Sequence, residues 1–156
     1  MGFHERHNLF SVINASGTMT YLGACSVAAP VINAVAECLP HLVEIPHLQA
    51  RASEVISRLC SSEAGCVTAC AAARIAVGVA ACMTGEDLAK IDQLPNTTGM
   101  KGEVVIMRRH FVGFGAEILQ MIRIAGATPV EVEGATRCLP YQLEGAIGGG
   151  QLLPCT

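Results

Sequence analysis

The chain has 156 residues, of which 51% are hydrophobic, 15% charged and 4% aromatic, and it contains no Trp. This composition is rich in core residues and poor in surface residues, which predicts a piece of a larger protein or a subunit with large interfaces. A net charge of −3 without a basic tract argues against nucleic-acid binding by this chain alone.

The targeting and thiol signals favour the cytoplasm. The start MGFHERHNLF lacks the cationic segment and long apolar run of a signal peptide. No cysteine pair has the CxxC spacing of a zinc or redox motif, and most cysteines sit among Ala, Val and Leu. We therefore expect small buried side chains with free thiols, as in a reducing compartment. The cysteines are Cys25, Cys38, Cys60, Cys66, Cys70, Cys82, Cys138 and Cys155.

Hydrophobic periodicity predicts an α/β domain. A Gly/Ser/Thr-rich loop covers residues 14–23, and a helix starts near Ala29, where Pro30 is tolerated in the first turn. An amphipathic helix is then followed by three strand–helix pairs, an order typical of a mostly parallel sheet. The amphipathic helix is expected at 47–60, the strands at 65–68, 103–109 and 128–133, and the later helices after 72, at 116–126 and from 141. The expected organisation is an N-terminal segment and loop at 1–28, a large domain at 29–147 and a divergent tail at 148–156.

The stretch SSEAGCVTACAAARIAVGVAACMTGEDLAK, residues 61–90, has three interpretations. A membrane span needs ~20 apolar residues, which this stretch could supply, but Arg74 in its middle argues against insertion. A plain core helix is the second. The third is a strand at Gly65–Thr68 and a turn of small residues, followed by a helix whose free N–H groups and dipole hold a phosphate. Neither a Walker A nor a Rossmann fingerprint is present.

Histidines supply the other candidates. His110 follows the strand at 103–109 and would face the crevice where parallel sheets bind ligands, although a solvated loop histidine is the plainer interpretation. His4 and His7 have the HxxH spacing of metal ligands, but a chain terminus is more often solvent-exposed, so no metal site is predicted. Arg108 and Arg109 are adjacent and would point to opposite faces of a strand.

Five segments in sequence order resemble one group of pyridoxal-phosphate enzymes. The group contains bacterial selenocysteine synthase (L-seryl-tRNA(Sec) selenium transferase) and relatives of the D-glucosaminate-6-phosphate ammonia-lyase type. The resemblance runs from about Val12 to Ile147, and GMKGEVVI with its following His and FGA is closer to the ammonia-lyase branch. The segments are VINASGTMTYLG, HLVEIPHLQARASEVISRL, EAGCVTACAAARIAVGVAACMTG, LPNTTGMKGEVVIMRRHFVGFGAEILQMIRIAGATPVEVEGATR and YQLEGAI.

The resemblance implies the N-terminal part of the fold type I large domain, a partial three-layer sandwich with a mostly parallel sheet. It implies pyridoxal phosphate as cofactor, with the backbone N–H groups of Ala71, Ala72 and Ala73 at its phosphate and His110 over its pyridine ring. Arg74 stands where relatives commonly have Gly, and it would either add a cation near the phosphate or crowd it. Relatives also differ after Arg137, which puts any substrate role there in doubt.

The resemblance further implies elimination or replacement at the β-position of an amino acid or amino sugar acid. It also implies a homo-oligomer and an N-terminal segment that approaches an active site, either its own or the neighbour's.

No residue of this sequence matches the ones that carry out the covalent chemistry in the family. In the family, a Lys that binds the cofactor and an Asp that pairs with its ring nitrogen lie further along, and neither Lys90 nor Lys101 matches the lysine motif. We assign no catalytic residue and expect a truncated chain that is inactive alone, as the Gly-rich end GGGQLLPCT also suggests. The alternatives are a non-enzymatic product, a subunit that completes a site with a second chain, and a small α/β phosphate-binding module.

Overall fold

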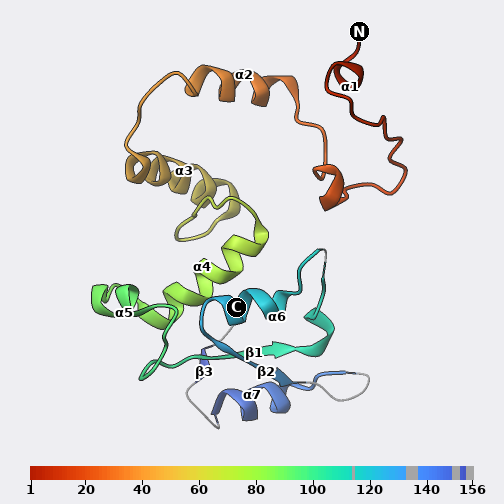
Figure 1. Cartoon of the computed structure of the whole chain (residues 1–156). Helices are drawn as coiled ribbons and strands as arrows, with labels where there is room; N and C mark the ends of the chain where they lie inside the picture. The colour runs from red at the N-terminus through yellow and green to blue at the C-terminus, as the bar shows by residue number, and fades with distance from the viewer. Residues whose placement is uncertain (114, 133–136, 149–151, 154–156) are drawn as a thin grey trace. The chain divides into compact units, whose positions relative to one another are not determined.

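A computed structural model of the chain describes residues 1–113, 115–132, 137–148 and 152–153 (Figure 1). The chain divides into two compact units, Met1–Val43 and Glu44–Thr156. The expected tail at 148–156 lies mostly outside the described residues.

The first unit is built from short elements without a core. They are α1 (Phe3–Arg6), the 3₁₀ helix η1 (Thr20–Leu22) and α2 (Ala29–Cys38). Helix α2 begins as the sequence predicts, with Pro30 in its first turn. None of residues 1–43, all of which the structure describes, is buried within the chain.

The second unit begins with helices. Helix α3 (Ile45–Cys60) confirms the predicted amphipathic helix, and α4 (Ala71–Thr84) confirms the helix after residue 72. Gly85 follows α4 with φ +54°, and a short helix that the sequence did not predict comes next. This helix, α5 (Leu88–Gln93), starts at Asp87, whose Oδ1 accepts hydrogen bonds from the N–H groups of Ala89 and Lys90.

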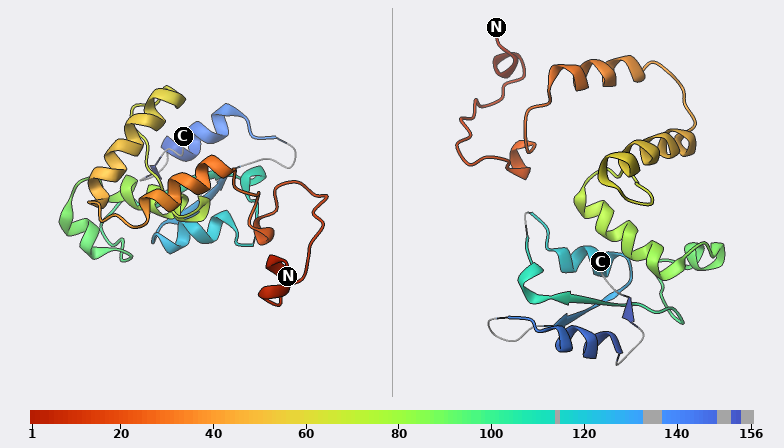
Figure 2. Two further views of the ribbon diagram at one scale, coloured as in Figure 1. Left: turned by 90° about the horizontal axis from the view of Figure 1, so that it is seen from above. Right: turned by 180° about the vertical axis from the view of Figure 1, so that it is seen from behind.

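The sheet is parallel throughout, with strand order β2-β1-β3. Strands β1 (Glu103–Met107) and β2 (Thr128–Val132) confirm two predicted strands, and β3 (Leu152–Leu153) pairs with the start of β1. Helix α6 (Ile118–Ile124) connects β1 to β2, and α7 (Pro140–Gly148) connects β2 back across β1 to β3. The two connections run in opposite directions across the sheet, and α6 and α7 lie on its opposite faces (Figures 1 and 2), as the right-handed rule for parallel connections requires.

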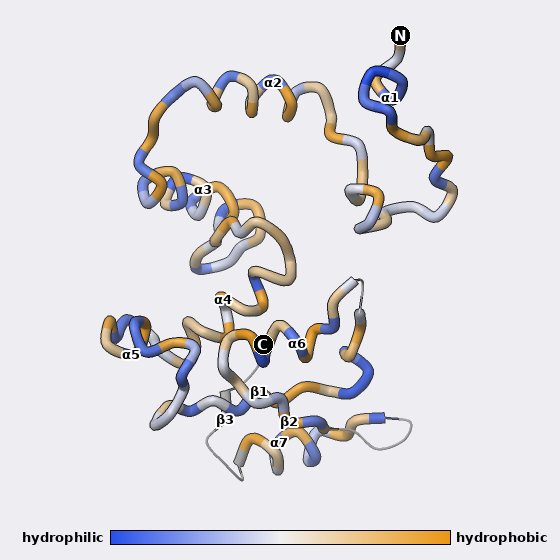
Figure 3. The backbone as a smooth tube through the Cα atoms, viewed as in Figure 1, coloured by the Kyte–Doolittle hydropathy of each residue, from blue (hydrophilic) through white to orange (hydrophobic). Residues whose placement is uncertain are grey.

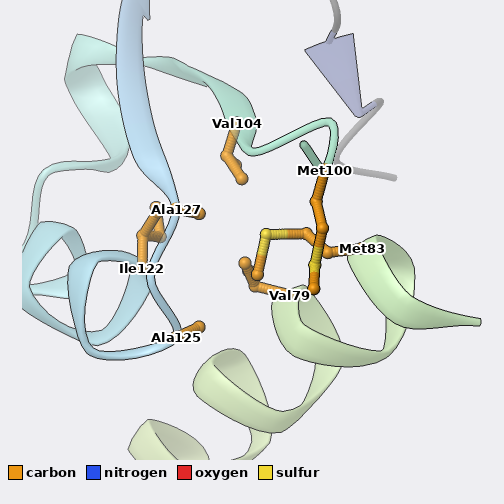
Figure 4. Packing of buried hydrophobic residues seen from close by; sticks show 7 residues of the cluster. All are labelled: Val79, Met83, Met100, Val104, Ile122, Ala125 and Ala127. Carbon is orange, nitrogen blue, oxygen red and sulfur yellow. The ribbon is translucent and has the colours of Figure 1, made fainter. Parts of the chain in front are cut away.

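The core lies between α4, α6 and the sheet. Val79 and Met83 reach from α4 toward Met100 and Val104, and Ile122 closes the cluster from α6 (Figure 4). Val104 and Ile122 are only 1% and 2% exposed. The seven residues are Val79, Met83, Met100, Val104, Ile122, Ala125 and Ala127.

Two turns end the elements around this core, one after α6 and one after β1. Gly126 follows α6 with φ +87°, the left-handed conformation in which glycine commonly ends a helix. The predicted strand at 103–109 stops at Met107, and Arg108–His110 turn into the 3₁₀ helix η2. Figure 3 shows this change from apolar strand to hydrophilic turn.

Two sequence-based expectations are wrong. Residues 65–68 form no strand, because side chains of α3 rather than a neighbouring strand bind their backbone. The cysteines among the described residues are free, as expected, but they are not buried: Cys138 is half-buried, and Cys25, Cys38, Cys60, Cys66, Cys70 and Cys82 are exposed. An α/β fold with a parallel sheet is otherwise confirmed, and no helix in the described part of the chain is long and apolar enough to cross a membrane.

The cap of α5 yields a pH-dependent test. The hydrogen bond from the Lys90 side chain, followed by that from the Lys90 backbone, lowers the pKa of Asp87. A lowered carboxyl pKa means that the ionised cap stabilises the fold above the ordinary Asp pKa of about 3.9, and that this contribution is lost as the pH falls through the lowered pKa. We expect the Ala89 and Lys90 amides to be protected from hydrogen exchange near neutral pH and to lose that protection in acid. Asp87→Asn, which keeps the acceptor but not the charge, should show no such titration; an identical pH profile would contradict the assignment.

Candidate active site

The start of α4 presents free backbone donors. Cys70 is the N-cap residue, and its Sγ accepts a hydrogen bond from the N–H of Ala73 at 3.4 Å, while its carbonyl oxygen accepts one from the N–H of Arg74 at 3.0 Å. Among the described residues, the N–H groups of Ala71 and Ala72 have no hydrogen-bond partner. Two open donors at the positive end of a helix dipole favour an anion.

Side chains of α3 fix the segment that leads into this turn. The Gln49 side-chain amide makes two hydrogen bonds with the Val67 backbone: Nε2 donates to the carbonyl at 2.7 Å, and Oε1 accepts from the N–H at 3.1 Å. Ser53 Oγ accepts from the N–H of Gly65 at 2.9 Å. These bonds satisfy backbone groups that a strand neighbour would otherwise serve.

His110 lies in η2, just beyond the carboxyl end of β1, and is exposed. It lines a cavity of about 330 Å³ together with side chains of α4, β1, α6 and α7. His110 is the single polar residue among the described residues that line this cavity. The others are Ile75, Val79, Val105, Ile106, Met107, Ile118, Ile122 and Leu143.

Arg74 lies on a different side of α4. It lines a second cavity of about 520 Å³ with Val77, Gly78 and Ala81, whereas Ile75 and Val79 line the cavity of His110. At about 100° per residue, the centres of these two sets lie about 130° apart around the helix, so they fall on different faces. The structure thus groups Ala71, Ala72, Ala73 and Arg74 at one helix start and brings His110 to the face of α4 that carries Ile75, but it does not bring Arg74 and His110 into one cavity.

The other candidate residues from the sequence line neither of these two cavities. His4 and His7 pack against Phe3 in α1, with ring centroids 5.7 and 4.7 Å from that ring. No group of three or more His, Cys, Asp or Glu residues that could hold a metal ion exists among the described residues. Arg108 pairs with Glu131 at 3.6 Å, and Arg137 is exposed.

Sequence reasoning missed the residues that position the turn. Gln49 and Ser53 lie beside Ile56 at the edge of the apolar face of α3, where nothing in the pattern distinguishes them from solvated residues. Cys70 was missed because Ser, Thr, Asp and Asn are the usual N-cap residues. Its place directly before the alanine run was the one available signal.

Known proteins resemble the chain over nearly its whole length. It is 40% identical over 144 residues to D-glucosaminate-6-phosphate ammonia lyase of Salmonella typhimurium, which covers 92% of this chain. It is also 32% identical over 130 residues to 5'-C-glycyluridine monooxygenase-decarboxylase of a Streptomyces species, a match that covers 83% of it. A solved structure of D-glucosaminate-6-phosphate ammonia-lyase superposes with a TM-score of 0.88 at 39% identity, over 94% of this chain and 40% of that one.

The chain is a homologue of D-glucosaminate-6-phosphate ammonia lyase. The ammonia-lyase side of the sequence resemblance is therefore confirmed, while the selenocysteine synthase side stays a prediction. The chain spans 39% and 33% of the lengths of the two curated relatives, so it matches only part of each. No family model matches it.

Gly65 offers a test of how the turn is positioned. A Cβ added there would lie 2.5 Å from Cγ2 and 2.6 Å from Cβ of Ile56 on α3. We expect Gly65→Ala to lower the free energy of unfolding by about 1–3 kcal/mol, as overpacking does, and Ile56→Gly, which removes the Ile56 atoms that the new Cβ meets, to relieve part of that loss in the double variant. Urea denaturation measures both.

Gly78→Ala is the matched control for that change. An added Cβ at Gly78 meets no atom within 4 Å, and Gly78 lies inside α4, so we expect a gain of about 0.5–1 kcal/mol from helix propensity. If Gly65→Ala proved as harmless as Gly78→Ala, the close packing of the turn on α3 would be refuted.

Proposed function

We propose that this chain carries the cofactor-phosphate end of a pyridoxal-phosphate-dependent lyase of fold type I. The observation that carries the proposal is the pair of open N–H groups at Ala71 and Ala72, in a chain 40% identical to an ammonia lyase. A dianionic phosphate ester fits such a helix start, because charge-assisted hydrogen bonds from main-chain donors are strong and need no basic side chain.

The residues at the turn have different roles in binding the phosphate. Ala71 and Ala72 donate to the phosphate, and Ala73 holds the turn in place through its bond to Cys70 Sγ. The N–H of Arg74 is already bonded to Cys70, and its side chain lines the second cavity, so Arg74 adds positive charge near the phosphate rather than a direct contact.

His110 supports the ring of the cofactor. Its cavity of about 330 Å³ is within the range of small-molecule pockets and is otherwise apolar, which suits a flat heteroaromatic ring that stacks on an imidazole. Ile75 lines this cavity one turn beyond Ala71, so the same helix serves both ends of one small molecule.

Bound pyridoxal phosphate supplies an electron sink for carbanions at the α-carbon of an amino acid. By analogy with the relative, the substrate is an amino acid or amino sugar acid that loses ammonia, and the complete enzyme is a cytoplasmic homo-oligomer with a three-layer sandwich. In the same proposal, residues 29–147 form part of the large domain, residues 1–28 form an N-terminal segment, and the tail begins at residue 148.

A second candidate is cofactor binding without catalysis. Lys90 is paired with Asp87 at 3.3 Å in α5, and Lys101 precedes β1. Neither of these lysines lines either cavity among the described residues, so neither is placed to bond the cofactor. Mass spectrometry after borohydride reduction separates the two candidates, because a stable adduct at one specific lysine of this chain would overturn the second.

Ala71→Pro tests the phosphate site. Proline is favoured at the first position of a helix, and Cys70 before it is already extended, with φ −164° and ψ 172°, so the variant removes one donor while keeping α4. We expect pyridoxal phosphate to bind about tenfold more weakly, since a hydrogen bond to a charged group contributes about 1.5–3 kcal/mol. Ala71→Gly, which keeps the N–H, should bind as the unmodified chain does. Equal affinity of Ala71→Pro would refute the site.

His110→Ala tests the ring site with a different ligand. Pyridoxal lacks the phosphate, so its weak binding reports contacts to the ring alone. We expect His110→Ala to weaken pyridoxal binding several-fold and His110→Phe to restore it, because stacking needs an aromatic ring and contributes about 0.5–1.5 kcal/mol. Fluorescence titration of both variants measures this, and an unchanged His110→Ala would remove His110 from the site.

A further inference from the structure

The segment that leads from α3 into α4 is held by its backbone more than by its side chains. Val67 is 51% exposed, so apolar burial does little to keep this residue in place. No described strand pairs with residues 64–68. The Gln49 amide instead binds both the carbonyl and the N–H of Val67, at 2.7 and 3.1 Å. Gln49 is half-buried, which shields these two bonds in part from competing water.

Hydrogen bonds continue from Val67 to the start of α4. Thr68 Oγ1 donates to the carbonyl oxygen of Cys70 at 3.1 Å, and the same oxygen accepts from the N–H of Arg74 at 3.0 Å. Three residues lie between Val67 and Ala71, the first residue of the helix. A short segment that is bonded at both ends transmits the position of Val67 to the open donors at the turn.

We propose that Gln49 is a positioning residue for the cofactor phosphate, because its hold on Val67 sets the direction in which the N–H groups of Ala71 and Ala72 point. This inference rests on the proposed function and extends the phosphate site from the turn to α3. Gln49 lines neither cavity among the described residues, so it acts through Val67 and not by touching the ligand.

The physical reason is the narrow geometry of main-chain donors. An N–H group binds a phosphate oxygen well only at about 2.7–3.2 Å and close to linear, and such donors must be held to within about 0.5 Å by groups outside the contact itself. The small side chains of Ala71 and Ala72 offer no other adjustable donor. The turn therefore depends on its anchor for affinity.

The coupling has to act in both directions. If the bonds between Gln49 and Val67 favour phosphate binding, then bound phosphate must stabilise those bonds by the same free energy. Pyridoxal, which lacks the phosphate, has nothing to place at the turn and should show no such coupling. A general structural role would change the binding of both ligands.

Affinities of the full chain for pyridoxal phosphate and for pyridoxal test the proposal. We expect Gln49→Ala to weaken binding of pyridoxal phosphate by roughly five- to tenfold, the lower end of coupling between two sites, and to leave pyridoxal binding unchanged. Gln49→Glu keeps the length of the side chain and the acceptor for the Val67 N–H, but its carboxylate has no donor for the Val67 carbonyl. It should therefore also weaken pyridoxal phosphate binding near neutral pH.

Gln120→Ala is the matched control. Gln120 is exposed on α6, and its side chain has no hydrogen-bond partner among the described residues, so both affinities should stay as in the unmodified chain. A double variant gives a further check. The losses from Gln49→Ala and Ala71→Pro should be less than additive, because both act on the same pair of donors.

Hydrogen exchange on the unmodified chain serves as the measurement if Gln49→Ala does not fold. The Val67 N–H donates to Gln49 Oε1, so its exchange rate reports that bond. Saturating pyridoxal phosphate should slow this exchange several-fold, whereas saturating pyridoxal should not.

The outcomes separate this inference from the proposed function. An unmodified chain that does not bind pyridoxal phosphate overturns both. Binding that Ala71→Pro weakens and Gln49→Ala leaves unchanged overturns the positioning role alone. Equal losses of both ligands in Gln49→Ala, or a Val67 amide whose exchange ignores pyridoxal phosphate, also overturn the positioning role.

Discussion

The double hydrogen bond between the Gln49 amide and the Val67 backbone is the contact on which the rest of the site depends. It fixes where the extended segment ends, and so where α4 begins. A side-chain amide offers one donor and one acceptor in the spacing of a peptide group, so a single Gln replaces one residue of a neighbouring strand. Without that fixed point, the open donors of Ala71 and Ala72 would have no defined position relative to the sheet.

Helix α4, which starts at that fixed point, has two faces in different environments. The face with Val79 and Met83 is buried against Met100 and Val104, and this packing sets the rotation of the helix. Once the rotation is set, Arg74 lies about 100° around the helix from Ile75 on the inner face and lines a different cavity. The cation that makes a membrane span unfavourable is thus placed by the same apolar residues that make the helix look membrane-like in sequence.

The sequence predicted elements with strong local signals and missed those that depend on distant contacts. The strand Glu103–Met107 and the helix closed by Gly126 have clear periodicity and a left-handed glycine, and both are present. Residues 65–68 are β-prone, yet their partners are Gln49 and Ser53 on a helix, and no periodicity reveals such a pairing. The prediction that the cysteines are buried was wrong for a related reason: apolar neighbours in sequence predict burial only if another element covers them.

The start of α4 was predicted for the same physical reason, whereas its role as a site stays a prediction. The alanine run identified the start of a helix with open donors, which is a local property, and the structure keeps Ala71 and Ala72 unpartnered among the described residues. Arg74 could not be placed from sequence, because its direction depends on the rotation of α4 against a core assembled from residues up to about fifty positions later. A charge two or three residues from a phosphate turn can therefore belong to a different surface, and the face of the helix decides which ligand it meets.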